Sequence, residues 1–169
     1  MKRLLLLLFF SGLLGTAAGS ALALSSASVA NLALPAVIYS HAAQSSSGTM
    51  TLTATNDATT GFSVTILASG FAYSGLNAGS PIPAVNFSIT LAAAPAVTTG
   101  QAVDATGGPR VPATNATGAL NVARKTIQAD AGFGVGTYTQ ALAVTLSIPG
   151  QTRAGTYTST LTTTIGAAP

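Results

Sequence analysis

A two-residue alternation of apolar and small polar side chains constrains the fold of this chain more than any other feature. In residues 49–55 threonine takes every second position, and residues 142–148 alternate Leu, Val, Leu and Ile with Ala, Thr and Ser. Successive side chains of a strand point to opposite faces, so each such stretch has one face for the core and one for solvent. The pattern predicts half-buried strands of an all-β protein.

Roughly seven or eight short strands, separated by Gly, Pro and Asn clusters, indicate an antiparallel β-sandwich with Greek-key connections of the Ig-like or jelly-roll-like kind. Two strand pairs are expected to form hairpins. The first joins residues 49–55 to residues 62–66, and the second joins residues 136–148 to residues 155–165.

The other stretches are less regular. A further strand is expected at residues 85–91, residues 119–127 can be extended, and residues 92–119 should form loops or one poorly formed edge strand. The apolar positions of the alternating strands predict the core. Its expected members are Phe62, Val64, Ile66, Phe87, Ile89, Leu142, Val144, Leu146, Leu161 and Ile165.

Residues 1–23 have the three-part order of a secretory signal peptide. Two cations precede an apolar run, and small residues follow up to an A-x-A cleavage site that ends at Ala23. The apolar run is shorter than the roughly 20 residues that span a bilayer, which argues against a transmembrane anchor. We therefore expect cleavage before Leu24 and a secreted, extracellular or cell-surface protein without a transmembrane anchor.

Charge and cysteine content exclude several classes of partner. Cleavage would remove two of the six cations, which leaves four cations against three aspartates and a net charge of +1. Nucleic-acid binding needs clustered cations with stacking aromatics, so no nucleic-acid partner is predicted. The chain contains no cysteine and therefore no disulfide.

The surface is expected to be built from hydroxyls and small groups, because only 5% of the residues are charged. Such a surface could contact another copy of the chain or a glycan at little desolvation cost. The same composition could instead reflect a general preference of exported proteins for small residues.

An N-terminal strand and flexible joint are expected in residues 24–48, ahead of a sandwich domain in residues 49–169. Ala30, Leu32, Leu34, Ala36 and Ile38 alternate on one face of this strand, and Ser45-Ser46-Ser47-Gly48 forms the joint. The strand could pair within its own domain or enter the sheet of a neighbouring subunit and build a fibre. The first alternative is favoured because consecutive strands usually lie together.

The sequence Gly-Thr-Tyr occurs twice, as Gly136-Thr137-Tyr138 and Gly155-Thr156-Tyr157. In each copy the glycine permits a sharp entry into a strand, and the tyrosine can cover the core while its hydroxyl bonds to the backbone at a corner. Gly136, Tyr138, Gly155 and Tyr157 are therefore predicted to be structural residues.

The C-terminal blocks resemble those of a known family. They are FGVGTYTQ (133–140), LSIP (146–149) and AGTYTSTL (154–161), with DATTGFSV (57–64) as an earlier block. Together they resemble WxL-domain bacterial cell-surface proteins over residues 49–169. Phe62 and Thr163 stand at or near the positions of the two Trp-x-Leu motifs, and the chain contains no tryptophan. The resemblance implies non-covalent attachment to the cell wall.

The titratable residues are too few for a catalytic or metal site. His41 is the only histidine, and Asp57, Asp104 and Asp130 each lie beside turn-forming residues, where an aspartate bonds the nearby backbone. No serine lies in a Gly-x-Ser-x-Gly elbow. We predict no enzyme activity and no cofactor or metal. Asn86 and Asn115 begin glycosylation triplets, and Asn115 is the better acceptor because it lies in a predicted loop.

The leading hypothesis is a secreted, non-catalytic structural or adhesive protein whose partners are the cell envelope, other surface proteins or copies of itself. One alternative is a subunit of a fibre or pilus assembled by donor-strand addition. Another is a soluble extracellular carbohydrate-binding module that uses Tyr73, Asn77 and the 92–119 segment.

Overall fold

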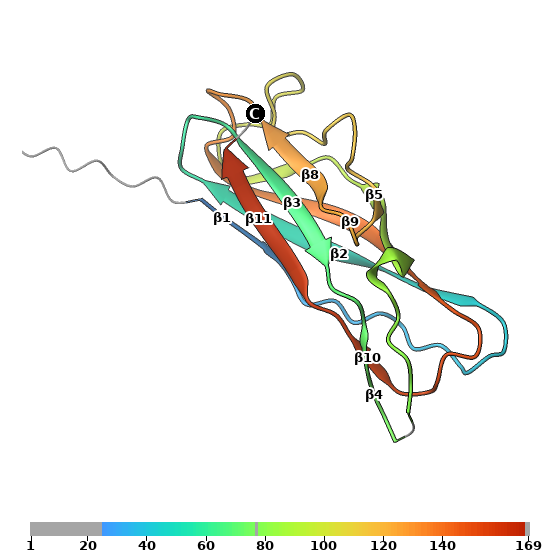
Figure 1. Cartoon of the computed structure of the whole chain (residues 1–169). Helices are drawn as coiled ribbons and strands as arrows, with labels where there is room; N and C mark the ends of the chain where they lie inside the picture. The colour runs from blue at the N-terminus through green and yellow to red at the C-terminus, as the bar shows by residue number, and fades with distance from the viewer. Residues whose placement is uncertain (1–24, 77, 168–169) are drawn as a thin grey trace, which may run out of the picture.

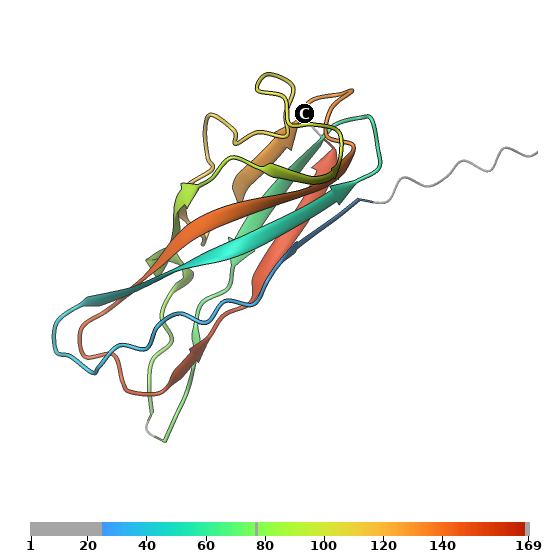
Figure 2. The same ribbon diagram turned by 180° about the vertical axis from the view of Figure 1, so that it is seen from behind.

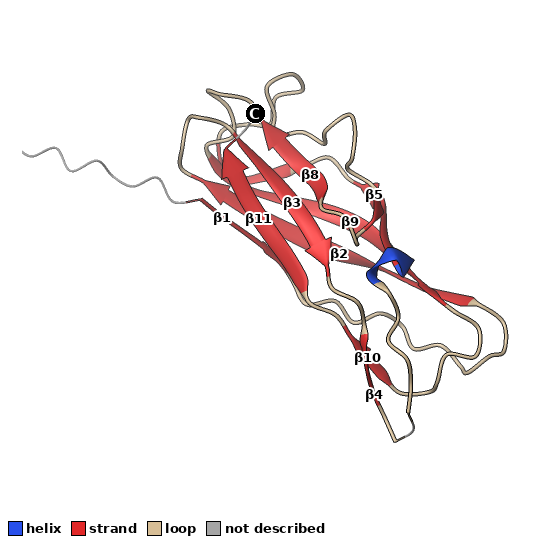
Figure 3. Ribbon diagram, in the orientation of Figure 1, coloured by secondary structure: helices blue, strands red, loops and turns tan. Residues whose placement is uncertain are grey.

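The structure, a computed structural model, describes residues 25–76 and 78–167. The predicted signal peptide and its cleavage point lie outside these residues. The described chain forms two antiparallel sheets packed face to face and a separate two-stranded sheet at one end, with a single short helical turn (Figures 1 and 3). The expected all-β sandwich is therefore confirmed, and its sheets do not close into a barrel.

The larger sheet has six strands in the order β1-β2-β9-β5-β7, and β6 also pairs with β9. Their bounds are β1 Ser25–Val29, β2 Gln44–Asn56, β5 Phe87–Ala92, β6 Ala96–Gly100, β7 Gly118–Ala119 and β9 Gly136–Ile148. Strands β2 and β9 pair along their whole length, from Gln44 opposite Ile148 to Asn56 opposite Gly136. This long pair forms the centre of the sheet.

The smaller sheet has three strands in the order β11-β3-β8. These are β3 (Phe62–Ala68), β8 (Arg124–Ala129) and β11 (Leu161–Ala167). Beyond a break at Ser69, the same two chain segments pair again as β4 (Ala72–Ser74) and β10 (Thr156–Thr158). The Ser69 hydroxyl accepts the Thr160 N–H at 2.9 Å across this break. We call the β4–β10 pair the terminal ribbon.

Both predicted hairpins are wrong. Strand β2 belongs to the larger sheet and β3 to the smaller one, and β9 is likewise in the opposite sheet from β11. The connections at residues 57–61 and 149–155 therefore cross between sheets, which lie about 10 Å apart in a sandwich. The alternating pattern shows which side chains face the core, but two strands of one hairpin and two strands of opposite sheets have the same pattern.

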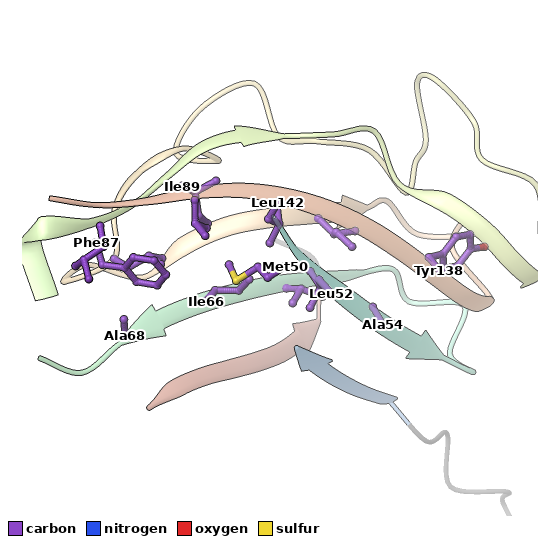
Figure 4. Packing of buried hydrophobic residues seen from close by; sticks show 14 of the residues in the cluster. Met50, Leu52, Ala54, Ile66, Ala68, Phe87, Ile89, Tyr138 and Leu142 are labelled. Atoms are coloured by element: carbon purple, nitrogen blue, oxygen red, sulfur yellow. The ribbon is translucent and has the colours of Figure 1, made fainter. Parts of the chain in front are cut away.

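The core lies between the two sheets, where side chains from both meet (Figure 4). All predicted core residues are buried except Leu161 and Ile165, which are partly buried because β11 is an edge strand of the smaller sheet. Gln140 is a polar member of the interior. Its side-chain amide donates to the carbonyl oxygens of Ala93 and Thr126, each at 2.9 Å. These bonds connect β9 to the residue after β5 and to β8 of the smaller sheet.

The strand predicted at residues 85–91 begins later than expected. A short 3₁₀ helix (Ala84–Asn86) precedes Phe87, so Val85 is 54% exposed. A bulge between Ile89 and Leu91 breaks the alternation, and Leu91 is 62% exposed. Local backbone features that the pattern does not reveal therefore move two apolar side chains out of the expected face.

The N-terminal predictions also need correction. Residues 30–38 are not a strand, and the first strand, β1, ends at Val29. Pro35 has no N–H to donate to a ladder, which disfavours strand pairing there. The predicted joint, residues 45–48, lies inside β2, because pairing with β9 holds this Ser-Gly run extended in spite of its low strand propensity.

Candidate functional site

A groove of about 850 Å³ lies at one end of the sandwich. At this end the β2–β9 pair and the terminal ribbon separate, and residues 30–40 run between them (Figures 1 and 2). The floor is apolar and includes Phe71, Ile82, Phe87 and Leu146. We call this hollow the inter-sheet groove and residues 30–40 the arm segment.

Two leucines seat the arm segment in the groove. Leu32 and Leu34 are partly buried and pack against the core. Gly48 lies on the inward face of β2, and a Cβ atom there would be 3.2 Å from a methyl group of each leucine. The missing side chain of Gly48 therefore leaves the space that the two leucines occupy.

Hydrogen bonds to the arm segment are sparse. The Ala30 N–H donates to the Thr51 carbonyl at 3.1 Å, the Ser46 hydroxyl donates to the Pro35 carbonyl at 2.6 Å, and Ser40 O accepts a further backbone bond. Within the described chain, Pro35 O is the one backbone group of residues 31–39 that forms a hydrogen bond. Side-chain packing, rather than a backbone ladder, holds this segment.

The outer half of the arm segment leaves apolar side chains in water. Val37 is 39% exposed, Ile38 86% and Tyr39 51%. Ala30 and Ala36 are also exposed, so the predicted apolar face of five alternating residues is only partly buried. Three consecutive exposed apolar residues at the mouth of an apolar groove form a surface suited to association.

The opposite wall is formed by residues 152–161, which include β10. Among the described residues β10 pairs only with β4, so its other edge is open towards the groove. Tyr157 lies opposite Tyr73 in this pair, with ring centroids 5.3 Å apart. Its hydroxyl donates to Arg153 O at 3.0 Å, and a side chain at Gly155 would overlap the Tyr73 ring. Burial of the phenol, with a smaller contribution from Tyr73, raises the pKa of Tyr157.

The second Gly-Thr-Tyr copy lies in a different environment. Tyr138 is fully buried, and its hydroxyl lies 2.9 Å from Gln101 O and 3.2 Å from Val135 O. Burial raises the pKa of Tyr138. Gly136 has φ 140°, and a side chain there would overlap the Thr99 carbonyl. The two copies therefore share a sequence but not a degree of burial.

His41 lies outside any cluster of titratable groups. It is exposed in the turn before β2. Its ring packs edge-on against the Tyr39 ring, with the two ring centroids 5.4 Å apart. In the two described ranges, no group of three or more His, Cys, Asp and Glu side chains could hold a metal ion.

Two of the aspartates have defined local partners. Asp104 accepts the backbone N–H groups of Gly107 and Thr106, at 2.6 and 2.8 Å, and these bonds lower the pKa of its carboxyl. Asp130 pairs with the Arg110 guanidinium at 3.0 Å, which lowers the pKa of Asp130. The third aspartate, Asp57, is exposed in the connection from β2 to β3.

The candidate glycosylation residues differ in access. Asn86 ends the 3₁₀ helix, is half-buried, and donates from its amide to Ser147 O at 3.0 Å. Asn115 is exposed in a loop with φ 65°. Of the residues considered for carbohydrate binding, Tyr73 is half-buried and Asn77 lies outside the described residues.

No protein-family model, curated protein or solved structure matches this chain. Over residues 25–76 and 78–167, no helix is both long and apolar enough to span a bilayer.

The sequence pattern drew attention to the arm segment but not to its receptor. The Ser-Gly composition predicts a joint at Gly48, although Gly48 continues the apolar positions Met50 and Leu52 at a spacing of two. A glycine within an alternating strand often marks a place where another segment approaches closely, and this signal could have identified the site.

Proposed function

We propose that this chain is a secreted, non-catalytic structural or adhesive protein of the cell surface, which contacts the envelope or other copies of itself through the groove end of the sandwich. The observation that carries the proposal is the run Val37-Ile38-Tyr39, exposed beside the apolar inter-sheet groove. Burying a side chain such as Ile38 at a contact contributes roughly 1.5 to 3 kcal/mol.

Further observations support this class of function. The predicted signal peptide favours export, and the resemblance to WxL-domain proteins favours the cell wall as the site of attachment. Asp104 and Asp130 are engaged in a turn and an ion pair, which favours a structural use of these carboxylates over a catalytic one. Exposed threonines such as Thr49 and Thr162 allow close contact at little desolvation cost.

Sedimentation with isolated cell walls and size-exclusion chromatography test this proposal. Ile38→Asp should reduce wall binding or self-association severalfold, because it places a charge at the apolar contact. Leu91→Asp is the matched control, since Leu91 is also exposed but lies outside the groove. A protein that remains monomeric and does not bind walls would refute the proposal. Binding to a soluble neutral glycan instead would favour the carbohydrate-binding alternative.

Exchange of the N-terminal segment between subunits is a second candidate, which would make the protein a fibre subunit. It is favoured by the sparse hydrogen bonding of the arm segment and by the open edge of β10 across the groove. The arm of a second copy could make the same leucine contacts over Gly48, because an exchanged segment keeps its original environment.

A donor and an acceptor variant test this exchange. Gly48→Val introduces a Cβ that would lie 3.2 Å from Leu32 and Leu34 and adds two methyl groups beyond it, so it should release the arm and close the groove to any other arm. A chain that begins at His41 lacks both β1 and the arm segment and keeps Gly48. We expect each variant alone to be monomeric and the mixture to form a one-to-one complex.

Substituting Leu32 and Leu34 by Ser in the donor is the control and should abolish that complex. A folded acceptor that does not bind the donor would rule out exchange. An acceptor that unfolds, together with a full-length protein that stays monomeric at high concentration, would rule it out as well.

A further inference from the structure

A second hollow, of about 440 Å³, lies between β8 and the loop that follows Gly108. It shares no lining residue with the inter-sheet groove. Its lining includes two cations, Arg110 and Lys125, together with the amide side chains of Asn115 and Gln128, and we call it the basic cleft. Within the described ranges the chain has four cations, and of these only Arg153 lies away from the cleft, in the groove wall.

A bulge in β8 builds one wall of the basic cleft. The register against β3 shifts between Lys125 and Ile127, and Thr126 and Ile127 are both buried. In a regular strand, residues three apart point to opposite faces. The extra residue at Thr126 changes this, so Lys125 and Gln128 both line the cleft.

The opposite wall is held by Arg124. Its guanidinium donates to Ala119 O at 2.9 Å and to the Asn115 side-chain oxygen at 2.8 Å. Asn115 has φ 65°, and its amide donates to Ala123 O at 3.3 Å. The cation therefore fixes the loop residue that faces Lys125 across the cleft.

The charges of the cleft are not balanced within the described chain. One nitrogen of Arg110 donates to Asp130 at 3.0 Å, whereas its other terminal nitrogen, Nη1, is buried without a hydrogen-bond partner in that chain. No carboxylate of the described residues lies within ion-pair distance of Lys125. Arg110 and Lys125 thus line the cleft and Arg124 bonds to its Asn115, while Asp130 forms an ion pair with Arg110 and one Arg110 nitrogen has no hydrogen-bond partner in the described chain.

We propose that the basic cleft binds an oxyanion group, a phosphate or a carboxylate, carried by an anionic polymer of the cell surface. Guanidinium and ammonium groups provide the charge-assisted donors that such oxygens accept. Repeated anionic groups on one polymer raise the apparent affinity of a site that binds a single group weakly. The inference rests on the proposed surface function only in naming the cell surface as the source of the polymer.

The test uses the purified full-length secreted chain, with inorganic phosphate, polyphosphate, polygalacturonate and neutral dextran as probes. Amide NMR shifts should locate binding at residues 110–115 and 124–128. Lys125→Gln should weaken binding about tenfold, since it removes one charged hydrogen bond. Asn115→Asp should abolish it, because it keeps the side-chain shape and the bond from Arg124, loses the long bond to Ala123 O, and adds a negative charge.

Arg153→Gln is the matched control, because it removes one charge outside the cleft, and it should change affinity less than twofold. An equal loss in this variant would show that only net charge matters and would overturn the proposal. Absence of shifts with phosphate up to about 10 mM and with both polyanions would also overturn it.

Stronger binding of polyphosphate than of polygalacturonate would assign a phosphate ligand, and the reverse a carboxylate, whereas equal binding of dextran would refute oxyanion recognition. Ile38→Asp should leave probe binding unchanged, so this proposal and the proposed surface function can fail separately.

Discussion

Removing one hydroxyl at Tyr138 should destabilise the protein by about 1 to 3 kcal/mol. The Tyr138 side chain is 0% exposed, and its hydroxyl is within hydrogen-bond distance of Gln101 O and Val135 O. In Tyr138→Phe the ring keeps its packing against Phe62, so the loss comes from the hydrogen bond and from the carbonyl left without its donor.

The magnitude follows from burial. A neutral hydrogen bond contributes about 0.5 to 1.5 kcal/mol. Where the acceptor of a part-buried bond is left without its donor and no water replaces it, the total cost rises to roughly 1 to 3 kcal/mol. Val135 O still accepts the Gln101 N–H at 2.8 Å, so the added cost falls mainly on Gln101 O. For a domain of this size the change corresponds to a fall in melting temperature of roughly 3 to 10 °C.

The pH dependence provides a second readout. Burial raises the pKa of Tyr138, so the folded state favours the neutral phenol. The resulting stability is fully present below about pH 10, the pKa of an unfolded tyrosine, and is lost as pH rises through the higher folded pKa. Wild-type protein should therefore lose stability above about pH 10 more steeply than Tyr138→Phe.

Denaturant unfolding at neutral and alkaline pH measures both effects, and Tyr157→Phe is the matched control. The Tyr157 hydroxyl bonds to an exposed carbonyl, so its loss should cost under about 0.5 kcal/mol, because water replaces the bond. Equal losses in the two variants would refute the argument from burial. Loss of wall binding by Tyr157→Phe at an unchanged melting temperature would instead assign that tyrosine to a ligand site.

Three further outcomes are expected. Leu146→Ala should cost about 2 to 5 kcal/mol in denaturant unfolding, against under about 0.5 kcal/mol for exposed Leu91→Ala, and equal costs would mean that the face assignment is wrong. Asp104→Asn should lower the melting temperature at pH 7 and flatten its fall below about pH 4, because backbone N–H groups lower the Asp104 pKa and its ionised form stabilises the fold above that range. Intact-mass analysis of secreted protein should give a chain that begins at Leu24, and retention of residues 1–23 would contradict the export argument.

The candidate site was only partly predictable from the sequence. The apolar alternation of residues 30–38 identified a segment that needs a partner surface, and Leu32 and Leu34 do pack against the core. The alternation did not show that Gly48 receives them or that Ile38 remains in water. These outcomes depend on where along the sandwich the two sheets separate. The position of that separation is set by residues far apart in the chain.

The sequence by itself determined which face of each main strand is buried, as at Val64 and Val144. That information is local, because the side chains of a strand alternate whatever the strand pairs with. Only the tertiary structure decided the pairing of β2 with β9, the burial of Tyr138 against the partial exposure of Tyr157, and the bulge that brings Lys125 and Gln128 to one cleft. Each of these depends on contacts between segments that are distant in the sequence. A two-residue period does not specify which strand pairs with which, or which strand of the other sheet packs against it.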